Sequence, residues 1–209
     1  MTRTARHVIS SQQKRRSNFP KPHPTDDKGV RQTFEFVPTT PPTHLPLDDI
    51  RHAVASDPYW SRLLSETPAL RSVHLAVFVE PFLGSLLSGQ KTVESRFSVV
   101  RCPPYGRVAS GDVLLVKRSG GPVVGVCEVR ETWSYLLDAE TWSSIRRDFM
   151  AAMCAQDPTF WERKRNASYA TLMRITNARP IEAVAWKKRD RRGWVVVQGR
   201  SQPHSMESQ

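Results

Sequence analysis

Short apolar segments rich in β-branched residues recur along the chain from residue 72 onward, separated by turn signals. Ser72–Val79 (SVHLAVFV) is apolar apart from a serine and a histidine, which is typical of a buried strand. Ser119-Gly120-Gly121 lies between the apolar segments Val113–Lys117 and Val123–Arg130 and predicts a hairpin. This pattern restricts the chain to a sheet-based fold, and His74 is expected to be a core histidine with bonded ring nitrogens.

The other segments complete the expected order of elements. Helices are expected at 47–55, Tyr59–Glu66, Pro81–Ser88 and Asp138–Ala155. Further strands are expected at Thr92–Val99, Tyr169–Ile175 and Trp194–Val197, with a loop at Arg101–Ser110. From residue 72 the order is β-α-β-β-β-α-β-β. It predicts an α+β fold built on a small mixed or antiparallel β-barrel with flanking helices.

Composition divides the chain into four parts. Residues 1–45 hold eight Lys/Arg against three Asp/Glu, contain six prolines and lack apolar periodicity, so we expect a disordered basic tail. Residues 46–71 form a helical lead-in, and residues 72–198 form the barrel domain. Residues 199–209 are expected to be a disordered C-terminus.

The net charge of +11 favours polyanionic partners, because each cation near a phosphate releases condensed counterions. The tail carries the basic cluster Lys14-Arg15-Arg16. Two further segments, Trp161–Arg165 and Trp186–Arg192, combine a tryptophan with several cations. Such mixtures suit single-stranded RNA, although each alone is also typical of a charged surface.

Several other classes are disfavoured. The three cysteines, Cys102, Cys127 and Cys154, have neither disulfide-scaffold nor zinc-site spacing, and Cys127 is expected to be a buried thiol. No Ser/His/Asp, phosphate-loop or dinucleotide-binding pattern is present. No apolar run is long enough to span a membrane, and no secretory signal is evident. We therefore expect a cytoplasmic protein without cofactor, metal or membrane partner, and the oligomeric state stays open.

The octapeptide Gly89–Arg96 (GQKTVESR) places charges inside this otherwise apolar region. Gly89 is expected to stop a helix, and Lys91 to begin a strand with its ammonium pointing into the barrel opening. Side chains alternate along a strand, so Thr92, Glu94 and Arg96 share one face and the last two can pair. The alternative from spacing alone is a surface hairpin with ordinary ion pairs.

Two residues outside the octapeptide are further candidates for ligand binding. Tyr105 lies in the loop expected to face the octapeptide strand, where its ring would stack on a base or pack on Pro103-Pro104. Lys117 precedes the glycine turn, where it would contact a phosphate or mark a solvated hairpin end. With Lys91, Thr92, Glu94 and Arg96 they make up the predicted binding residues.

The octapeptide resembles the GxKxxExR signature of the ASCH family, with Gly89, Lys91, Glu94 and Arg96 at the required spacing. The helix before it and the segment Gly111–Arg118 after it are also similar to that family. The resemblance covers roughly 120 residues. It implies a PUA-like barrel with a pocket lined by these charged residues, which binds RNA or a modified nucleotide.

The resemblance also implies two alternatives. Some relatives are hydrolases, either ribonucleases or amidohydrolases of N4-acetylcytidine. If this chain is such a hydrolase, Lys91 and Glu94 would be its catalytic residues. This chain has Glu94 where the amidohydrolases have a threonine, which disfavours amidohydrolase activity, and Glu128 and Glu140 are the candidates for the later acid. The other alternative is a protein-interaction module in transcription or translation, suggested by the tail.

Overall fold

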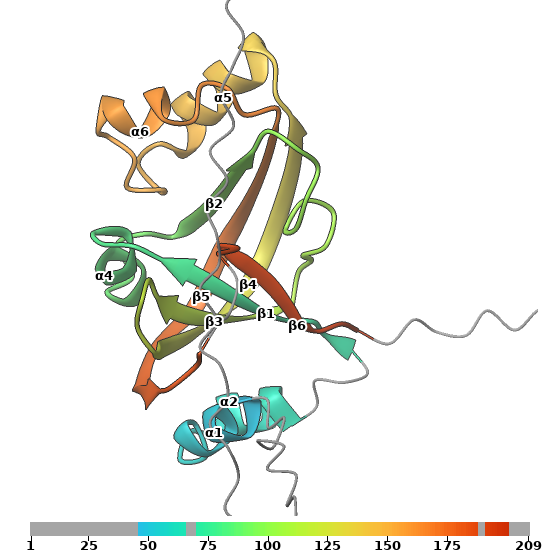
Figure 1. Cartoon of the computed structure of the whole chain (residues 1–209), viewed down its shortest axis with the longest axis vertical. Coiled ribbons are helices and arrows are strands. Elements are labelled where there is room, and N and C mark those ends of the chain that lie inside the picture. Colours follow the sequence, from blue (N-terminus) through green and yellow to red (C-terminus); the bar gives the residue numbers. More distant parts are fainter. Residues whose placement is uncertain (1–45, 66–69, 188–190, 201–209) are drawn as a thin grey trace, which may run out of the picture. The chain divides into compact units, whose positions relative to one another are not determined.

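The computed structural model describes residues 46–65, 70–187 and 191–200 (Figure 1). The predicted tail (1–45) and most of the predicted C-terminus (201–209) lie outside the described residues. The helices are α1 (Leu47–Ala53), α2 (Pro58–Ser65), α4 (Phe82–Leu87), α5 (Ala139–Phe149) and α6 (Pro158–Glu162). The strands are β1 (Val73–Phe78), β2 (Val93–Ser98), β3 (Val113–Arg118), β4 (Val123–Leu136), β5 (Tyr169–Val184) and β6 (Trp194–Gln198).

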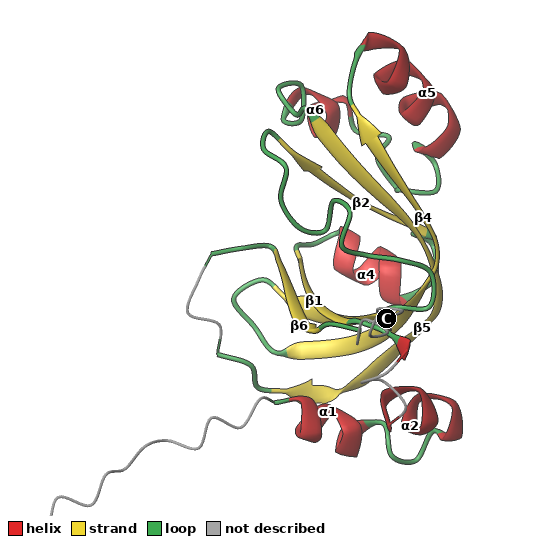
Figure 2. Ribbon diagram, turned by 90° about the vertical axis from the view of Figure 1, so that its right-hand side faces the viewer, coloured by secondary structure: helices red, strands yellow, loops and turns green. Residues whose placement is uncertain are grey.

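These strands form one six-stranded sheet in the order β2-β5-β4-β3-β1-β6. The β1–β3 pair is parallel and all other pairs are antiparallel, so the sheet is mixed. It curls strongly into a half-barrel, with helices on its faces and at its end (Figure 2). The predicted α+β fold is confirmed, and β2 and β6 are the two edges of the half-barrel.

The curl comes from the two longest strands, which the sequence pattern predicts to be shorter. β4 and β5 pair along most of their length, and their ladder is interrupted by three register shifts. Asn177, in the middle of β5, has a φ of 53°. Irregularities of this kind bend a strand and increase its local twist. The two-stranded ribbon that β4 and β5 form therefore bends away from the main sheet, and its far end lies beside β2.

Both faces of the central strands are buried. On β1, Val73 and Leu75 pack with α1 and α2 on the outer face, whereas Ala76 and Phe78 pack inside the curl with α4. β3 alternates in the same way. Strands buried on both faces read as continuous apolar runs, which explains why these two segments are visible in the sequence.

A third apolar cluster lies at the far end of the ribbon, under α5 and α6. Asp138 caps α5 through a reciprocal hydrogen-bond pair with Thr141, as its position before the apolar period predicts. The predicted helix to Ala155 is too long, because α5 ends at Phe149 and the chain turns through Cys154, where φ is 55°. These turns direct the carbonyl of Ala152 to the backbone N–H groups at the start of β2. No helix among the described residues is long and apolar enough to cross a membrane.

One glycine is required by close packing rather than by its backbone angles. A Cβ at Gly125 would lie 2.5 Å from Leu87 Cδ2 and 3.0 Å from the Arg179 carbonyl oxygen. We expect Gly125→Ala to lower the free energy of unfolding by about 1–3 kcal/mol, because the helix α4 contact must shift. Urea unfolding measures this, with Gly199→Ala as the control, since a Cβ there meets no atom within 4 Å. Equal stability of both variants would contradict the packing described.

Candidate functional site

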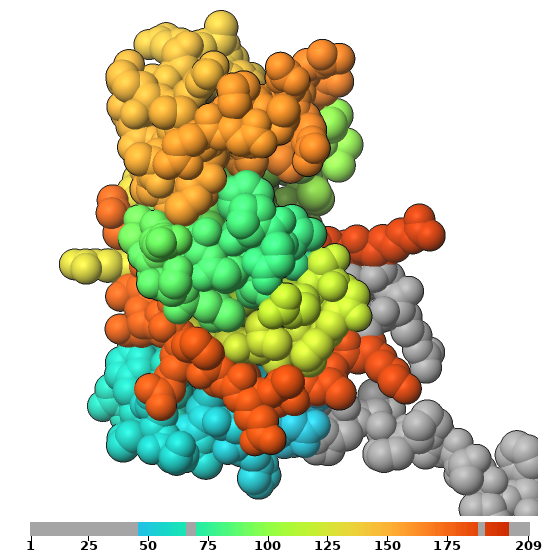
Figure 3. Space-filling view, turned by 90° about the vertical axis from the view of Figure 1, so that its left-hand side faces the viewer, coloured from blue at the N-terminus to red at the C-terminus, as the bar shows by residue number. Residues whose placement is uncertain are grey.

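A cavity of about 570 Å³ opens beside the edge strand β2. Its walls come from the end of β1, from β2, from residues 102–105, from α6 and the residues after it, and from Gly193-Trp194. Figure 3 shows the adjoining face, where α4 and the octapeptide (green) lie between the α6 region (orange) and the β3–β4 hairpin (yellow-green). Segments more than 100 residues apart in the chain thus meet at this cavity.

The octapeptide reaches the cavity through a tight turn. Gly89, with a φ of 77°, ends the segment after α4, and the Lys91 N–H donates to the Ser85 carbonyl. β2 begins at Val93, so Lys91 lies in the turn and not at the first position of the strand. Its ammonium donates to the Met153 carbonyl at 3.0 Å.

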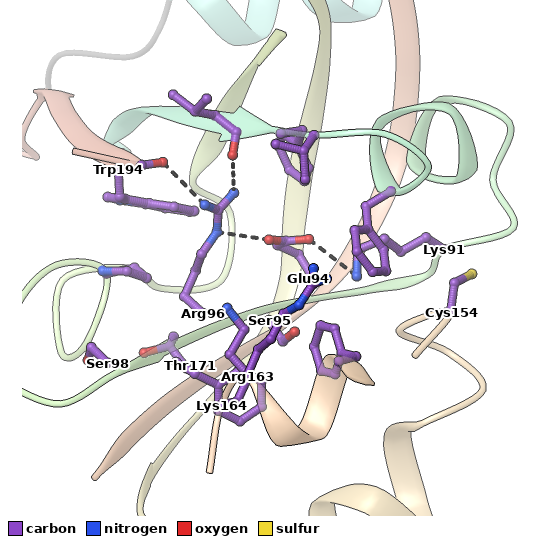
Figure 4. A pocket seen from close by; sticks show the side chains of 18 of the residues that line it. Lys91, Glu94, Ser95, Arg96, Ser98, Cys154, Arg163, Lys164, Thr171 and Trp194 are labelled. Atoms are coloured by element: carbon purple, nitrogen blue, oxygen red, sulfur yellow. Dashed lines mark hydrogen bonds and ion pairs between the residues drawn. The ribbon is translucent and has the colours of Figure 1, made fainter. Parts of the chain in front are cut away.

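Glu94 and Arg96 pair, as the alternation along a strand predicts. Glu94 Oε1 lies 2.8 Å from Arg96 Nε, an ion pair whose angle falls short of a hydrogen bond, and Glu94 Oε2 lies 3.4 Å from Lys91 Nζ (Figure 4). The exposed fractions of the Lys91 and Glu94 side chains are 3% and 6%. The carboxylate is therefore compensated by two cations at the inner wall of the cavity.

Arg96 also joins the two edges of the half-barrel. Its guanidinium donates to the Val77 carbonyl at 3.0 Å and to the Gly193 carbonyl at 3.2 Å. The same group lies 5.0 Å from the ring centre of Phe78 and 5.4 Å from that of Trp194. With Glu94, these contacts occupy the guanidinium, and they hold β2 against the segment that begins β6.

A buried polar chain supports the wall behind Arg96. The Trp194 indole N–H donates to His74 Nδ1 at 3.2 Å, so Nδ1 is the acceptor and Nε2 faces Asp112 Oδ2 at 3.1 Å. Asp112 also accepts from the Ser72 N–H and from Arg200. His74 is thus a core histidine with both nitrogens bonded, as expected from its place in an apolar strand.

The structure brings together four of the six predicted binding residues and leaves two apart. Lys91, Glu94, Arg96 and Tyr105 line the cavity. Thr92 is exposed and is not part of its wall. Lys117 is buried below a different hollow, where its ammonium donates to the Gly121 carbonyl, so it is not a solvated hairpin end.

Tyr105 lies at the cavity, and the ring it packs against is that of Tyr169. The two rings meet edge-on with their centres 5.0 Å apart, and the Arg101 guanidinium lies 5.5 Å from the centre of the Tyr105 ring. Both candidates for a later acid lie elsewhere. Glu128 accepts hydrogen bonds from Tyr59 and Asn177 on the other side of β4, and Glu140 is exposed on the first turn of α5.

Sequence reasoning misses the wall that α6 provides. Asp157, Phe160, Arg163 and Lys164 line the cavity, and so do two cysteines, Cys102 and Cys154. The one available signal is the tryptophan-and-cation composition of Trp161–Arg165, although Trp161 itself is buried and donates to the Ala155 carbonyl. That signal indicates a basic surface but not what it faces.

The described residues contain no group of three or more His, Cys, Asp or Glu side chains placed to hold a metal ion. Cys127 is fully buried, as expected, and burial raises the pKa of its thiol. The cavity offers aromatic rings, hydroxyls, carboxylates, cations and two cysteine thiols.

No protein-family model and no curated protein matches the chain. Among solved structures, it is similar to the crystal structure of ASCH from Zymomonas mobilis, at 15% identity and a TM-score of 0.44, over 54% of this chain and 72% of that chain. A mutant of the same protein matches at 16% identity and a TM-score of 0.46, over 56% of this chain and 76% of that chain. These structures bear the name of the family that the octapeptide resembles.

Proposed function

We propose that the cavity beside β2 binds a nucleotide, either free or as one unit of an RNA chain. The observation that carries this proposal is the pairing of aromatic walls with the Lys91–Glu94–Arg96 group in one cavity of about 570 Å³. Small-molecule sites commonly enclose about 300–1,000 Å³. The net charge of +11 adds attraction for any polyanionic ligand.

The walls have the composition that a base requires. Six aromatic rings border the cavity: Phe78, Phe82, Phe97, Tyr105, Phe160 and Trp194. Bases stack on rings with an open face, and each stacked base contributes about 1–3 kcal/mol. Phe78 and Trp194 already have the Arg96 guanidinium over them, so the other four rings are the candidates for stacking. Hydroxyls of Ser95, Ser98 and Thr171 lie among the rings and supply donors and acceptors for a base edge or a ribose.

Binding is favoured over hydrolysis by the state of the two candidate catalytic residues. Lys91 Nζ is engaged by Met153 and Glu94, and both Glu94 oxygens face cations. A lysine that acts as nucleophile or base needs a free electron pair, which these contacts do not favour. The hydrolase alternative predicts chemical turnover, so a ribonuclease gel and mass spectrometry of N4-acetylcytidine incubations distinguish it from binding.

The proposal predicts salt-dependent affinity for single-stranded RNA. Fluorescence anisotropy at two salt concentrations should give a slope of about −0.7 in log K against log salt for each phosphate contacted. Neutralising the tail cluster with Lys14→Gln, Arg15→Gln and Arg16→Gln should reduce that slope. Tyr105→Ala should weaken binding by about 1 kcal/mol or more at every salt concentration, because it removes a ring and no charge.

A matched control is Tyr135→Ala, which removes a ring that belongs to the apolar cluster under α5 and not to the cavity wall. Its effect on RNA affinity should be small once its folding is confirmed by circular dichroism. The proposal fails if no RNA or nucleotide binds at low salt. It also fails if Tyr105→Ala and Tyr135→Ala weaken binding equally. Binding that survives nuclease treatment and involves only proteins would favour the interaction-module alternative.

A further inference from the structure

The cations that line the cavity fall into two groups. Lys91 and Arg96 each face Glu94 and donate to backbone carbonyls, so their charges are already compensated within the protein. Arg163 and Lys164 follow α6 and line the same cavity from that segment. Within the ranges that the structure describes, neither of these two side chains makes a hydrogen bond or an ion pair.

Among the described residues, the acidic side chains at the cavity make no direct ion pair with Arg163 or Lys164. Glu80 accepts from Arg118 at 2.9 Å and from the Gly84 N–H at 3.0 Å. Asp157 is the N-cap of α6 and accepts from the Thr159 N–H and hydroxyl. Hydrogen bonds from Thr159 lower the pKa of Asp157, and the charge of Arg163 is a smaller cause in the same direction.

The surroundings of the Lys164 ammonium favour a bound anion. It is half-buried, and its ammonium lies 5.9 Å from the ring centre of Phe160. Burial lowers the pKa of Lys164, and the nearby Arg96 guanidinium lowers it further, while Glu94 opposes them. Figure 4 draws Lys164 and Arg163 on the α6 side of the cavity, with their side chains near Arg96 and Glu94. The ammonium therefore faces the cavity with donors that no described protein group uses.

We propose that Arg163 and Lys164 form a phosphate subsite, so that the ligand is a nucleoside phosphate and not a free nucleoside. This inference rests on the proposed function, because it assumes that the base occupies the aromatic part of the same cavity. Two adjacent cations without acceptors match the charge and the oxygens of a phosphate. The phosphate belongs either to a mononucleotide or to an RNA backbone, which share this chemistry.

The test is isothermal titration of the full chain with four kinds of probe. These are inorganic phosphate, the four common nucleosides, their 5′-monophosphates, and a trinucleotide with no terminal phosphate. Each is titrated into the unchanged protein and into Lys164→Ala, Lys164→Arg and Arg163→Ala. The matched control is Arg165→Ala, because Arg165 is an exposed cation of the same segment that does not line the cavity. Melting curves confirm that each variant is folded.

We expect the best monophosphate to bind about tenfold tighter than its nucleoside, and Lys164→Ala to remove most of that advantage. Lys164→Arg should retain most of it, and Arg165→Ala should change affinity by about twofold or less. If the trinucleotide binds with the same dependence on Lys164, the subsite takes a backbone phosphate. If only the monophosphates do, it takes a terminal one.

The two proposals fail in different ways. Equal binding of nucleosides and monophosphates, or equal effects of Lys164→Ala and Arg165→Ala, overturns the phosphate subsite while leaving base binding intact. Binding of inorganic phosphate that depends on Lys164, with no gain from any base, supports the subsite and overturns nucleotide specificity. Absence of binding by every phosphate-containing probe at millimolar concentration overturns the subsite.

Discussion

Replacing Glu94 with alanine is expected to destabilise the protein by about 3–5 kcal/mol, because it leaves Lys91 and Arg96 without their carboxylate. The Lys91 side chain is 3% exposed, so water does not solvate the abandoned ammonium. Removal of one partner from a buried ion pair costs far more than the pair itself contributes. The change should also loosen the contact between β2 and the segment before β6, because Arg96 joins them.

Urea unfolding at constant temperature measures this effect as a shift of the midpoint at unchanged slope. The matched control is Glu131→Ala, since Glu131 pairs with Arg174 at 3.2 Å but both side chains are about half exposed. An exposed pair of this kind contributes about 0–1 kcal/mol. Glu94→Gln should fall between the two. A cost for Glu94→Ala no larger than that for Glu131→Ala would contradict the buried, compensated arrangement.

The second large effect is expected at Asp112, behind the cavity wall. This carboxylate is fully buried and accepts from Ser72, Ala109, His74 and Arg200. Asp112→Ala should cost about 3–5 kcal/mol, because it leaves several buried donors unsatisfied. Asp112→Asn should cost nearly as much, since one oxygen becomes an NH₂ group that faces a backbone N–H.

Asp112 also predicts a loss of stability in acid. Burial alone would raise the pKa of Asp112, but hydrogen bonds from His74, Ser72 and Ala109 outweigh it, so the pKa is lowered. A carboxyl group whose folded pKa lies below its unfolded value of about 3.9 stabilises the fold above that value. This contribution is lost as the pH falls from the unfolded pKa through the folded pKa.

Unfolding curves between neutral pH and about pH 3 measure the contribution as a slope of the free energy of unfolding against pH. Asp112→Asn should reduce the slope on the acid side, because it removes the titrating group. The control is Asp49→Asn, which changes an exposed carboxylate on α1 and should leave the slope unchanged. An unaltered acid slope in Asp112→Asn would contradict the assigned role.

The sequence predicts those parts of the fold that depend on residues close together in the chain. β1 and β3 are visible because strands buried on both faces are continuously apolar. Glu94 and Arg96 lie next to each other because side chains on one face of a strand recur every two residues. Asp138 is recognisable as a helix cap because its partner is three residues away.

The parts that it does not predict depend on contacts between distant segments. The Met153 carbonyl that binds Lys91 comes from a stretch that the sequence predicts to be helical, and hydrogen bonds to the distant start of β2 help to stabilise its turn. The contact of Arg96 with Gly193 needs the curl of the whole sheet. Arg163 and Lys164 read as a charged surface, because no local pattern reveals a cavity on one side of α6.

The most direct test of nucleotide binding at this cavity is a nuclear magnetic resonance titration of the full chain with the four nucleoside monophosphates. The indole N–H of Trp194, on the cavity wall and bonded to His74, gives a resolved signal that reports the site. Binding in the cavity predicts saturable shifts of this signal and of the amides of residues 94–98 and 157–164. Unchanged signals there at millimolar nucleotide, or shifts confined to the hollow beside Lys117, would contradict it.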